Sequence, residues 1–156
     1  MTTPRAVSGK RDHAFLSYCR DNLNDVFQLR AELETRGEVI WWDQDILPGI
    51  DWKHAVNRAM AAAYAGIFCF SRELEGRIGS VMYVELRNAI SALREHAPGT
   101  PLIIPVRLSP CEIPDLEIDA TRTLRSLQVI DLFPASRRAA AIDRIVLSLR
   151  SSPYHP

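Results

Sequence analysis

The sequence predicts an α/β protein built on an open, doubly wound sheet of about five parallel strands with helices on both faces. Five short apolar segments alternate with segments that have helical periodicity. The apolar segments are continuous rather than alternating, which is typical of strands buried on both faces of a parallel sheet. A length of 156 residues suits one domain with one core.

The strands are predicted from the apolar runs. The fourth run contains Pro105, which cannot donate a ladder hydrogen bond and therefore predicts a bulge or a position that is paired on one side only. The fifth run is the weakest signal. The five strands are expected at residues 13–18, 39–42, 65–70, 102–108 and 127–132.

The helices are predicted from apolar positions at helical spacing and from the residues at their ends. Asp21 or Asn22 can cap the first helix, and Gly37 is suited to end it. Pro48-Gly49 is a strong turn signal in the loop after the second strand. The four helices are expected at about residues 21–36, 52–63, 80–95 and 135–149. We expect a loop at residues 72–79, and mixed loop and short helix at 109–126.

One domain is expected over residues 12–150, with a flexible N-terminal tail at 1–11 and a C-terminal tail at 151–156. Five strands that alternate with helices favour a flavodoxin-like sheet. Ligands of such sheets bind beyond the carboxyl ends of the strands, where the strand order reverses. The loops after the first three strands are therefore expected to line any site.

The composition excludes several classes of function. The formal net charge is +0, so no global field draws the chain to nucleic acid or to an anionic membrane. No apolar run reaches the roughly 18 residues that span a bilayer. The three cysteines are scattered and share no metal-ligand spacing with the four histidines. We therefore expect a cytoplasmic protein without a structural metal.

Three motifs follow one another along the chain: Ala14-Phe15-Leu16-Ser17-Tyr18-Cys19-Arg20-Asp21, then Trp41-Trp42-Asp43-Gln44-Asp45-Ile46-Leu47-Pro48-Gly49 with Trp52, and finally Glu85-Leu86. Each motif also has a purely structural interpretation. Arg20 could be solvated, and Asp43 could form a turn. Glu85 could be a surface glutamate near a helix N-terminus, where the helix dipole favours it by about 0.3–1 kcal/mol.

In their order and spacing, the three motifs resemble the Toll/interleukin receptor (TIR) domain family over about residues 13–133. The first resembles the family's strand that ends in Ser-Tyr, and the second resembles its aspartate, Leu-x-Pro-Gly turn and helix-opening aromatic. Glu85-Leu86 matches the glutamate of the NAD-cleaving members. Val81 departs from the pattern, because the family usually has an aromatic there, and Tyr83 lies on another side of the helix. Substrate fit or helix docking is expected to differ accordingly.

The resemblance implies a role for each matching residue. Glu85 is expected to be catalytic, and Asp43 to hold ribose hydroxyls. Arg20 could meet a phosphate with a two-pronged hydrogen bond, and Trp52 could pack on the base or the nicotinamide ring. The substrate-binding residues are expected to be Ser17, Tyr18, Arg20, Asp43, Trp52 and Ser71, the last of which directly follows the third strand.

The chemistry implied by the resemblance needs only one carboxylate. Nicotinamide leaves the ribose as a neutral molecule, so no general acid is required, in contrast to the paired carboxylates of ordinary glycosidases. An oxocarbenium-like charge develops on the ribose, and a fixed carboxylate such as Glu85 can stabilise it.

The resemblance thus implies an NAD⁺ glycohydrolase that gives nicotinamide and ADP-ribose or a cyclic ADP-ribose. It would act as a prokaryotic, anti-phage immune effector that is activated by self-assembly. NAD⁺ is the substrate, and no separate cofactor is expected. The expected partners are other TIR domains, in a filament or higher oligomer, and a sensor domain or activator outside this chain. Two alternatives stay open: a non-catalytic TIR scaffold, and a nucleoside deoxyribosyltransferase-like enzyme whose glutamate forms a covalent sugar adduct.

Overall fold

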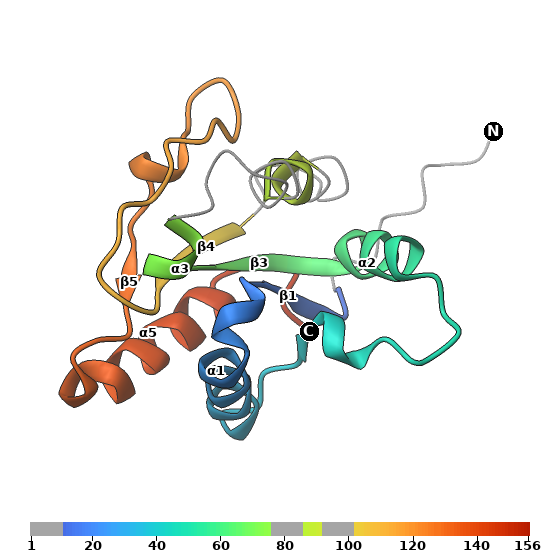
Figure 1. The fold of residues 1–156 in the computed structure, drawn as a ribbon, viewed down its shortest axis with the longest axis horizontal. Coiled ribbons are helices and arrows are strands. Elements are labelled where there is room, and N and C mark those ends of the chain that lie inside the picture. The colour runs from blue at the N-terminus through green and yellow to red at the C-terminus, as the bar shows by residue number, and fades with distance from the viewer. Residues whose placement is uncertain (1–10, 76–85, 92–101) are drawn as a thin grey trace.

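The computed structural model describes residues 11–75, 86–91 and 102–156. They form a parallel sheet with the strand order β2-β1-β3-β4-β5 (Figure 1). The order reverses between β1 and β3, which is the flavodoxin-like arrangement that was predicted. The strands are β1 (His13–Ser17), β2 (Ile40–Trp41), β3 (Ala63–Phe70), β4 (Leu102–Arg107) and β5 (Ile130–Asp131).

Helices cover both faces of the sheet, as expected for a doubly wound fold. In Figure 1, α1 and α5 lie together on one side of the strands. The helices are α1 (Leu23–Thr35), α2 (Trp52–Ala61), α3 (Arg72–Glu75) and α5 (Arg138–Arg150), and residues 86–91 are also helical. Short 3₁₀ turns are η1 (Arg20–Asn22), η2 (Asp43–Asp45), η3 (Leu124–Ser126) and η4 (Ala135–Arg137).

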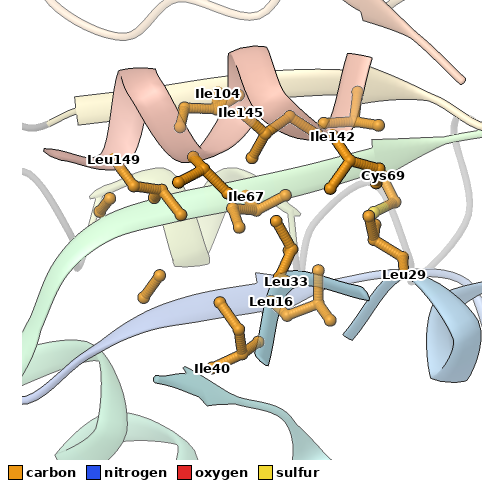
Figure 2. Packing of buried hydrophobic residues seen from close by; sticks show 14 of the residues in the cluster. Leu16, Leu29, Leu33, Ile40, Ile67, Cys69, Ile104, Ile142, Ile145 and Leu149 are labelled. Atoms are coloured by element: carbon orange, nitrogen blue, oxygen red, sulfur yellow. The ribbon is translucent and has the colours of Figure 1, made fainter. Parts of the chain in front are cut away.

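The first core lies between the sheet and the pair α1 and α5. Figure 2 shows leucine and isoleucine side chains of the two helices meeting side chains of the strands. Leu29 and Ile142, one from each helix, are fully buried. The labelled members of this cluster are Leu16, Leu29, Leu33, Ile40, Ile67, Cys69, Ile104, Ile142, Ile145 and Leu149.

The second core lies on the other face of the sheet. Phe15 of β1 and Phe68 of β3 pack there with Met60 of α2 and with Leu86. Successive residues of a strand point to opposite faces, and every residue of β3 is buried. This two-sided burial explains why the predicted strands are continuously apolar.

The edge strands are shorter than expected, and Val39, which was placed in the second strand, is 58% exposed. Pro105 pairs with Phe68 of β3, whereas pairing with β5 begins only at Val106. Pairing on one side is therefore how β4 accommodates the proline. One helical turn, α3, occupies part of the segment 72–79 that was expected to be a loop.

Gly37 ends α1 as expected. Its φ of +88° is left-handed, and its N–H donates to Glu34 O at 2.9 Å while Glu38 N–H donates to Leu33 O at 3.2 Å. These two bonds form a Schellman motif. The motif turns the chain towards β2, and the side chain of Glu38, two residues before that strand, is 1% exposed.

Residues 151–156, for which we expected a tail, make specific contacts with the domain. Tyr154 O accepts a 2.9 Å hydrogen bond from Arg11 N–H. His155 Nε2 donates to Glu38 Oε2 at 2.8 Å, and the His155 ring meets the Tyr64 ring edge-on. The expected N-terminal tail, except for Arg11, lies outside the described residues.

Candidate active site

A cavity of about 680 Å³ lies where the strand order reverses, at the ends of β1 and β3. This is the position at which doubly wound sheets bind ligands, and the volume is that of a small-molecule site. Aromatic side chains form much of the wall: Phe15, Trp41, Trp52 and Phe68. The cavity therefore offers flat apolar surfaces beside a few polar groups.

Five of the six expected substrate-binding residues line this cavity: Ser17, Tyr18, Arg20, Asp43 and Trp52. They come together because β1 and β2 are adjacent and parallel, with Phe15 opposite Trp41. Residues that directly follow the two strands therefore lie close together, beyond the carboxyl ends of β1 and β2. Trp52, the first residue of α2, is 48% exposed, so much of its indole surface is open to a ligand.

Ser71 does not reach the lining of the cavity. It is 1% exposed, and its Oγ donates to Asn22 Oδ1 at 2.6 Å and accepts from Leu74 N–H at 3.1 Å. The second bond caps the short helix α3. The structure thus gives Ser71 buried hydrogen-bond partners, and its contact with a ligand stays a prediction.

Asn22 precedes α1, as expected of a cap, but its side chain makes no capping hydrogen bond. Instead, Asn22 Nδ2 donates to Glu73 Oε2 at 3.2 Å. Hydrogen bonds from the backbone of Glu73 and then from Asn22 hold the pKa of the Glu73 carboxyl below its ordinary value. The network of Asn22, Ser71 and Glu73 ties the loop after β1, which carries Arg20, to the loop after β3.

Tyr18 and Asp43 contact each other directly across the ends of β1 and β2. The Tyr18 hydroxyl donates to Asp43 Oδ1 and accepts a 3.4 Å hydrogen bond from Gln44 Nε2. Burial, followed by the hydrogen bond to Asp43, raises the pKa of Tyr18 well above its ordinary value. The phenol therefore remains a protonated donor throughout the neutral pH range.

Several residues in the lining were not predicted from the sequence. Lys53 and Asn57 lie one helical turn apart on α2, and Asn88 and Ala89 belong to the helical residues 86–91. Residues at i and i+4 share a helix face, so Trp52 at the start of α2 was a usable signal for Val56, which also lines the cavity, but not for Lys53 or Asn57. Arg20 and Lys53 are both exposed and give the lining two cationic groups.

Glu85 lies outside the described residues, as do Val81 and Tyr83. The residue that follows Glu85 in the chain, Leu86, lines the cavity.

Within residues 11–75, 86–91 and 102–156, no three His, Cys, Asp or Glu side chains are grouped in a way that could hold a metal ion. In the same part of the chain, no helix combines the length and apolar character needed to cross a membrane.

The chain is similar in fold to several solved TIR structures. The TIR domain of the Toll-related receptor TRR-2 from Hydra magnipapillata is 17% identical, with a TM-score of 0.65, and the match covers 88% of this chain and 98% of that one. A metazoan TIR-STING receptor from C. gigas, in complex with 2′,3′-cGAMP, is 22% identical with a TM-score of 0.61. That match covers 94% of this chain but 42% of the receptor chain.

The TIR domains of the activated Roq1 resistosome are 18% identical, with a TM-score of 0.50, and the match covers 62% of this chain and 57% of that one. At these identities the likenesses establish the fold alone. No curated protein matches the chain. The model of the TIR domain family matches residues 14–146, which is most of the described fold and all of its strands except the first residue of β1. The chain belongs to the TIR domain family.

Proposed function

We propose that this TIR domain cleaves the bond between nicotinamide and ribose in NAD⁺, giving nicotinamide and ADP-ribose or a cyclic ADP-ribose. The observation that carries the proposal is the cavity at the ends of β1 and β3. It is lined by residues of the types that NAD⁺ recognition requires: aromatic rings for the bases, a carboxylate for ribose hydroxyls and cations for the diphosphate.

The catalytic group in this proposal is Glu85. Its neighbour Leu86 lines the cavity together with Asn88, which supports a role for this part of the chain at the site. The glutamate would stabilise the positive charge that develops on the ribose as nicotinamide departs. Apolar wall residues such as Phe15 and Phe68 would limit the water around that charge, which would strengthen its interaction with a carboxylate.

We further propose that the domain acts in assemblies of TIR domains, as an anti-phage effector that an activator switches on. Leu47 and Ile50, in the loop between β2 and α2, are 70% and 55% exposed. Apolar side chains on such a loop favour contact with another protein surface. Because Trp52 is two residues further on and lines the cavity, a contact at this loop would directly adjoin the site.

The test is incubation of concentrated protein with NAD⁺, followed by chromatographic measurement of nicotinamide and of the ADP-ribose products. Glu85→Gln is expected to abolish nicotinamide release and to leave the unfolding midpoint unchanged. Glu75→Gln is the matched control, because Glu75 is an exposed carboxylate outside the lining of the cavity. That variant should cleave NAD⁺ at the wild-type rate.

The rate per subunit should rise with protein concentration if assembly activates the domain. Nicotinamide release by a well-folded Glu85→Gln variant would contradict the assignment of Glu85. A folded wild-type protein that assembles and never cleaves NAD⁺ would identify a scaffold instead. A covalent sugar adduct on the intact protein, detected by mass spectrometry, would identify a deoxyribosyltransferase-like enzyme.

A further inference from the structure

We infer that Tyr18 is a positioning residue that acts through Asp43, and that the Tyr18–Asp43 pair selects ligands with a ribose hydroxyl. The inference rests on the proposed function, because it concerns how the same cavity recognises its substrate. It adds a role through Asp43 to the direct contact with substrate that was expected of Tyr18.

The direction of the hydrogen bonds at Tyr18 is fixed. The amide Nε2 of Gln44 can only donate, so the Tyr18 oxygen accepts from it and must direct its own proton elsewhere. That proton goes to Asp43 Oδ1. Because burial and the hydrogen bond to Asp43 raise the pKa of Tyr18, the phenol keeps its proton and remains a donor across the neutral pH range.

Only one of the two oxygens of the Asp43 carboxylate therefore accepts a hydrogen bond from the described residues. Oδ1 accepts from Tyr18, whereas the described residues provide no donor to Oδ2. Asp43 lines the cavity and is partly exposed, so the second oxygen can accept from a ligand. A hydroxyl on a ribose is a donor of suitable size, and charge-assisted bonds of this kind are strong.

The turn that carries Asp43 is also held from its other side. The Arg30 guanidinium lies 5.2 Å from the centre of the Trp42 ring, and its Nη2 is 3.4 Å from Asp45 Oδ1. Trp42 in turn packs against the Tyr18 ring, with 5.9 Å between the ring centres. Asp43 lies between these anchored groups, so its carboxylate is oriented before a ligand arrives. Such preorganisation is what makes a hydrogen-bond acceptor selective.

The experiment is a double-mutant cycle of ligand affinity. Titration calorimetry measures Kd for ADP-ribose and for two analogues, each lacking the 2′-hydroxyl of one of the two riboses. The proteins are wild type, Tyr18→Phe, Asp43→Asn and the double variant. Tyr64→Phe is the matched control, because Tyr64 also donates from a buried phenol to a carboxylate, Glu38, but does so near the opposite end of β3.

Wild type is expected to bind ADP-ribose about tenfold more tightly than one of the analogues. Tyr18→Phe and Asp43→Asn should each reduce this ratio to about twofold or less. The double variant should discriminate no less than Asp43→Asn alone, because the two side chains act as one unit. Tyr64→Phe should keep the wild-type ratio.

The inference is overturned if Tyr18→Phe keeps the tenfold ratio, if it weakens all three ligands equally, or if wild type prefers ADP-ribose to neither analogue. Cleavage of NAD⁺ by the same wild-type protein separates the two claims. If the protein cleaves NAD⁺ but gives one of these results, the inference about the Tyr18–Asp43 pair is wrong and the proposed function stands. If the protein neither cleaves NAD⁺ nor binds ADP-ribose, both the inference and the proposed function are wrong.

Discussion

His155 Nε2 donates a 2.8 Å hydrogen bond to a Glu38 carboxylate that is almost fully buried. The same carboxylate accepts from Tyr64 Oη at 3.2 Å and from Arg150 Nε at 3.2 Å. Three donors from three segments thus converge on one acidic group. This group lies near the amino-terminal ends of β2 and β3, remote from the cavity. This cluster attaches residues 151–156 to the domain.

Glu38→Ala is expected to lower the free energy of unfolding by about 2–3 kcal/mol, because it leaves the buried Tyr64 hydroxyl without its acceptor and removes an ion pair. Urea denaturation measures the change. Glu34→Ala is the control: its carboxylate is 40% exposed and pairs with Arg30 one turn away, so its loss should cost less than about 0.5 kcal/mol. Equal costs for the two variants would show that the cluster adds nothing beyond surface charge.

Gly49 is expected to resist substitution for a backbone reason alone. Residues 47–50 form a β-turn with Pro48 at its second position. Leu47 O accepts a 3.2 Å hydrogen bond from Ile50 N–H, and Gly49 at the third position has a φ of +85°. A Cβ at Gly49 would meet no atom within 4 Å. Gly49→Ala should therefore destabilise the domain by about 1 kcal/mol, which is the cost of left-handed backbone.

Gly49→Asn is the comparison variant, because asparagine tolerates left-handed backbone better than alanine. Urea denaturation should rank the stabilities as glycine, then asparagine, then alanine. A more stable alanine variant would show that this turn rearranges freely, and the strain argument would then be wrong.

The sequence predicted the fold well because burial leaves a direct trace in composition. β3 is buried at every position and was visible as an uninterrupted apolar run. The edge strands left a weaker trace: β5 has only partly buried residues, and its expected length was too great. Where half of the side chains face water, the apolar run is short and interrupted, so the pattern of apolar residues does not define the ends of the strand.

The candidate site was predictable only to the level of which residues gather. Ser17, Tyr18 and Asp43 could be placed together because parallel strands end at one edge of the sheet. The hydrogen bond between Tyr18 and Asp43 could not be predicted, since it depends on how two loops pack. Ser71 shows the same limit, because its burial against Asn22 arises from a tertiary contact between residues far apart in the sequence.

The cysteines should differ in reactivity towards Ellman's reagent at pH 8. Burial raises the pKa of the Cys69 thiol to about 12, so only about one molecule in 10⁴ carries the reactive thiolate. Cys111 is only partly buried; burial also raises its pKa, and Arg107 opposes that shift. Raising the pH increases the thiolate fraction of both groups, and Cys111 should react first.

The absorbance of the released thiol gives the count. The folded protein should release about one equivalent quickly at pH 8, and Cys111→Ser should release almost none. Protein in urea should release all three equivalents, because the chain has three cysteines. Rapid reaction of a folded Cys111→Ser variant would show that Cys19 or Cys69 is exposed in solution.

Arg20→Gln should raise KM for NAD⁺ about tenfold with little change in kcat. Arg20 is exposed and lines the cavity, and a guanidinium that binds the diphosphate contributes equally to the ground state and the transition state. Initial rates of nicotinamide release at several NAD⁺ concentrations separate the two constants. KM of wild type should rise with salt, and this dependence should weaken in the variant.

Arg144→Gln is the matched control for Arg20→Gln. Arg144 is an exposed arginine of α5, the helix that packs on the face of the sheet opposite to α2, so its loss removes the same charge without touching the cavity. Its KM and kcat should remain at wild-type values. An equal rise of KM in both variants would mean that only net charge attracts the substrate. A fall in kcat at constant KM in Arg20→Gln would mean that Arg20 acts on the transition state rather than on binding.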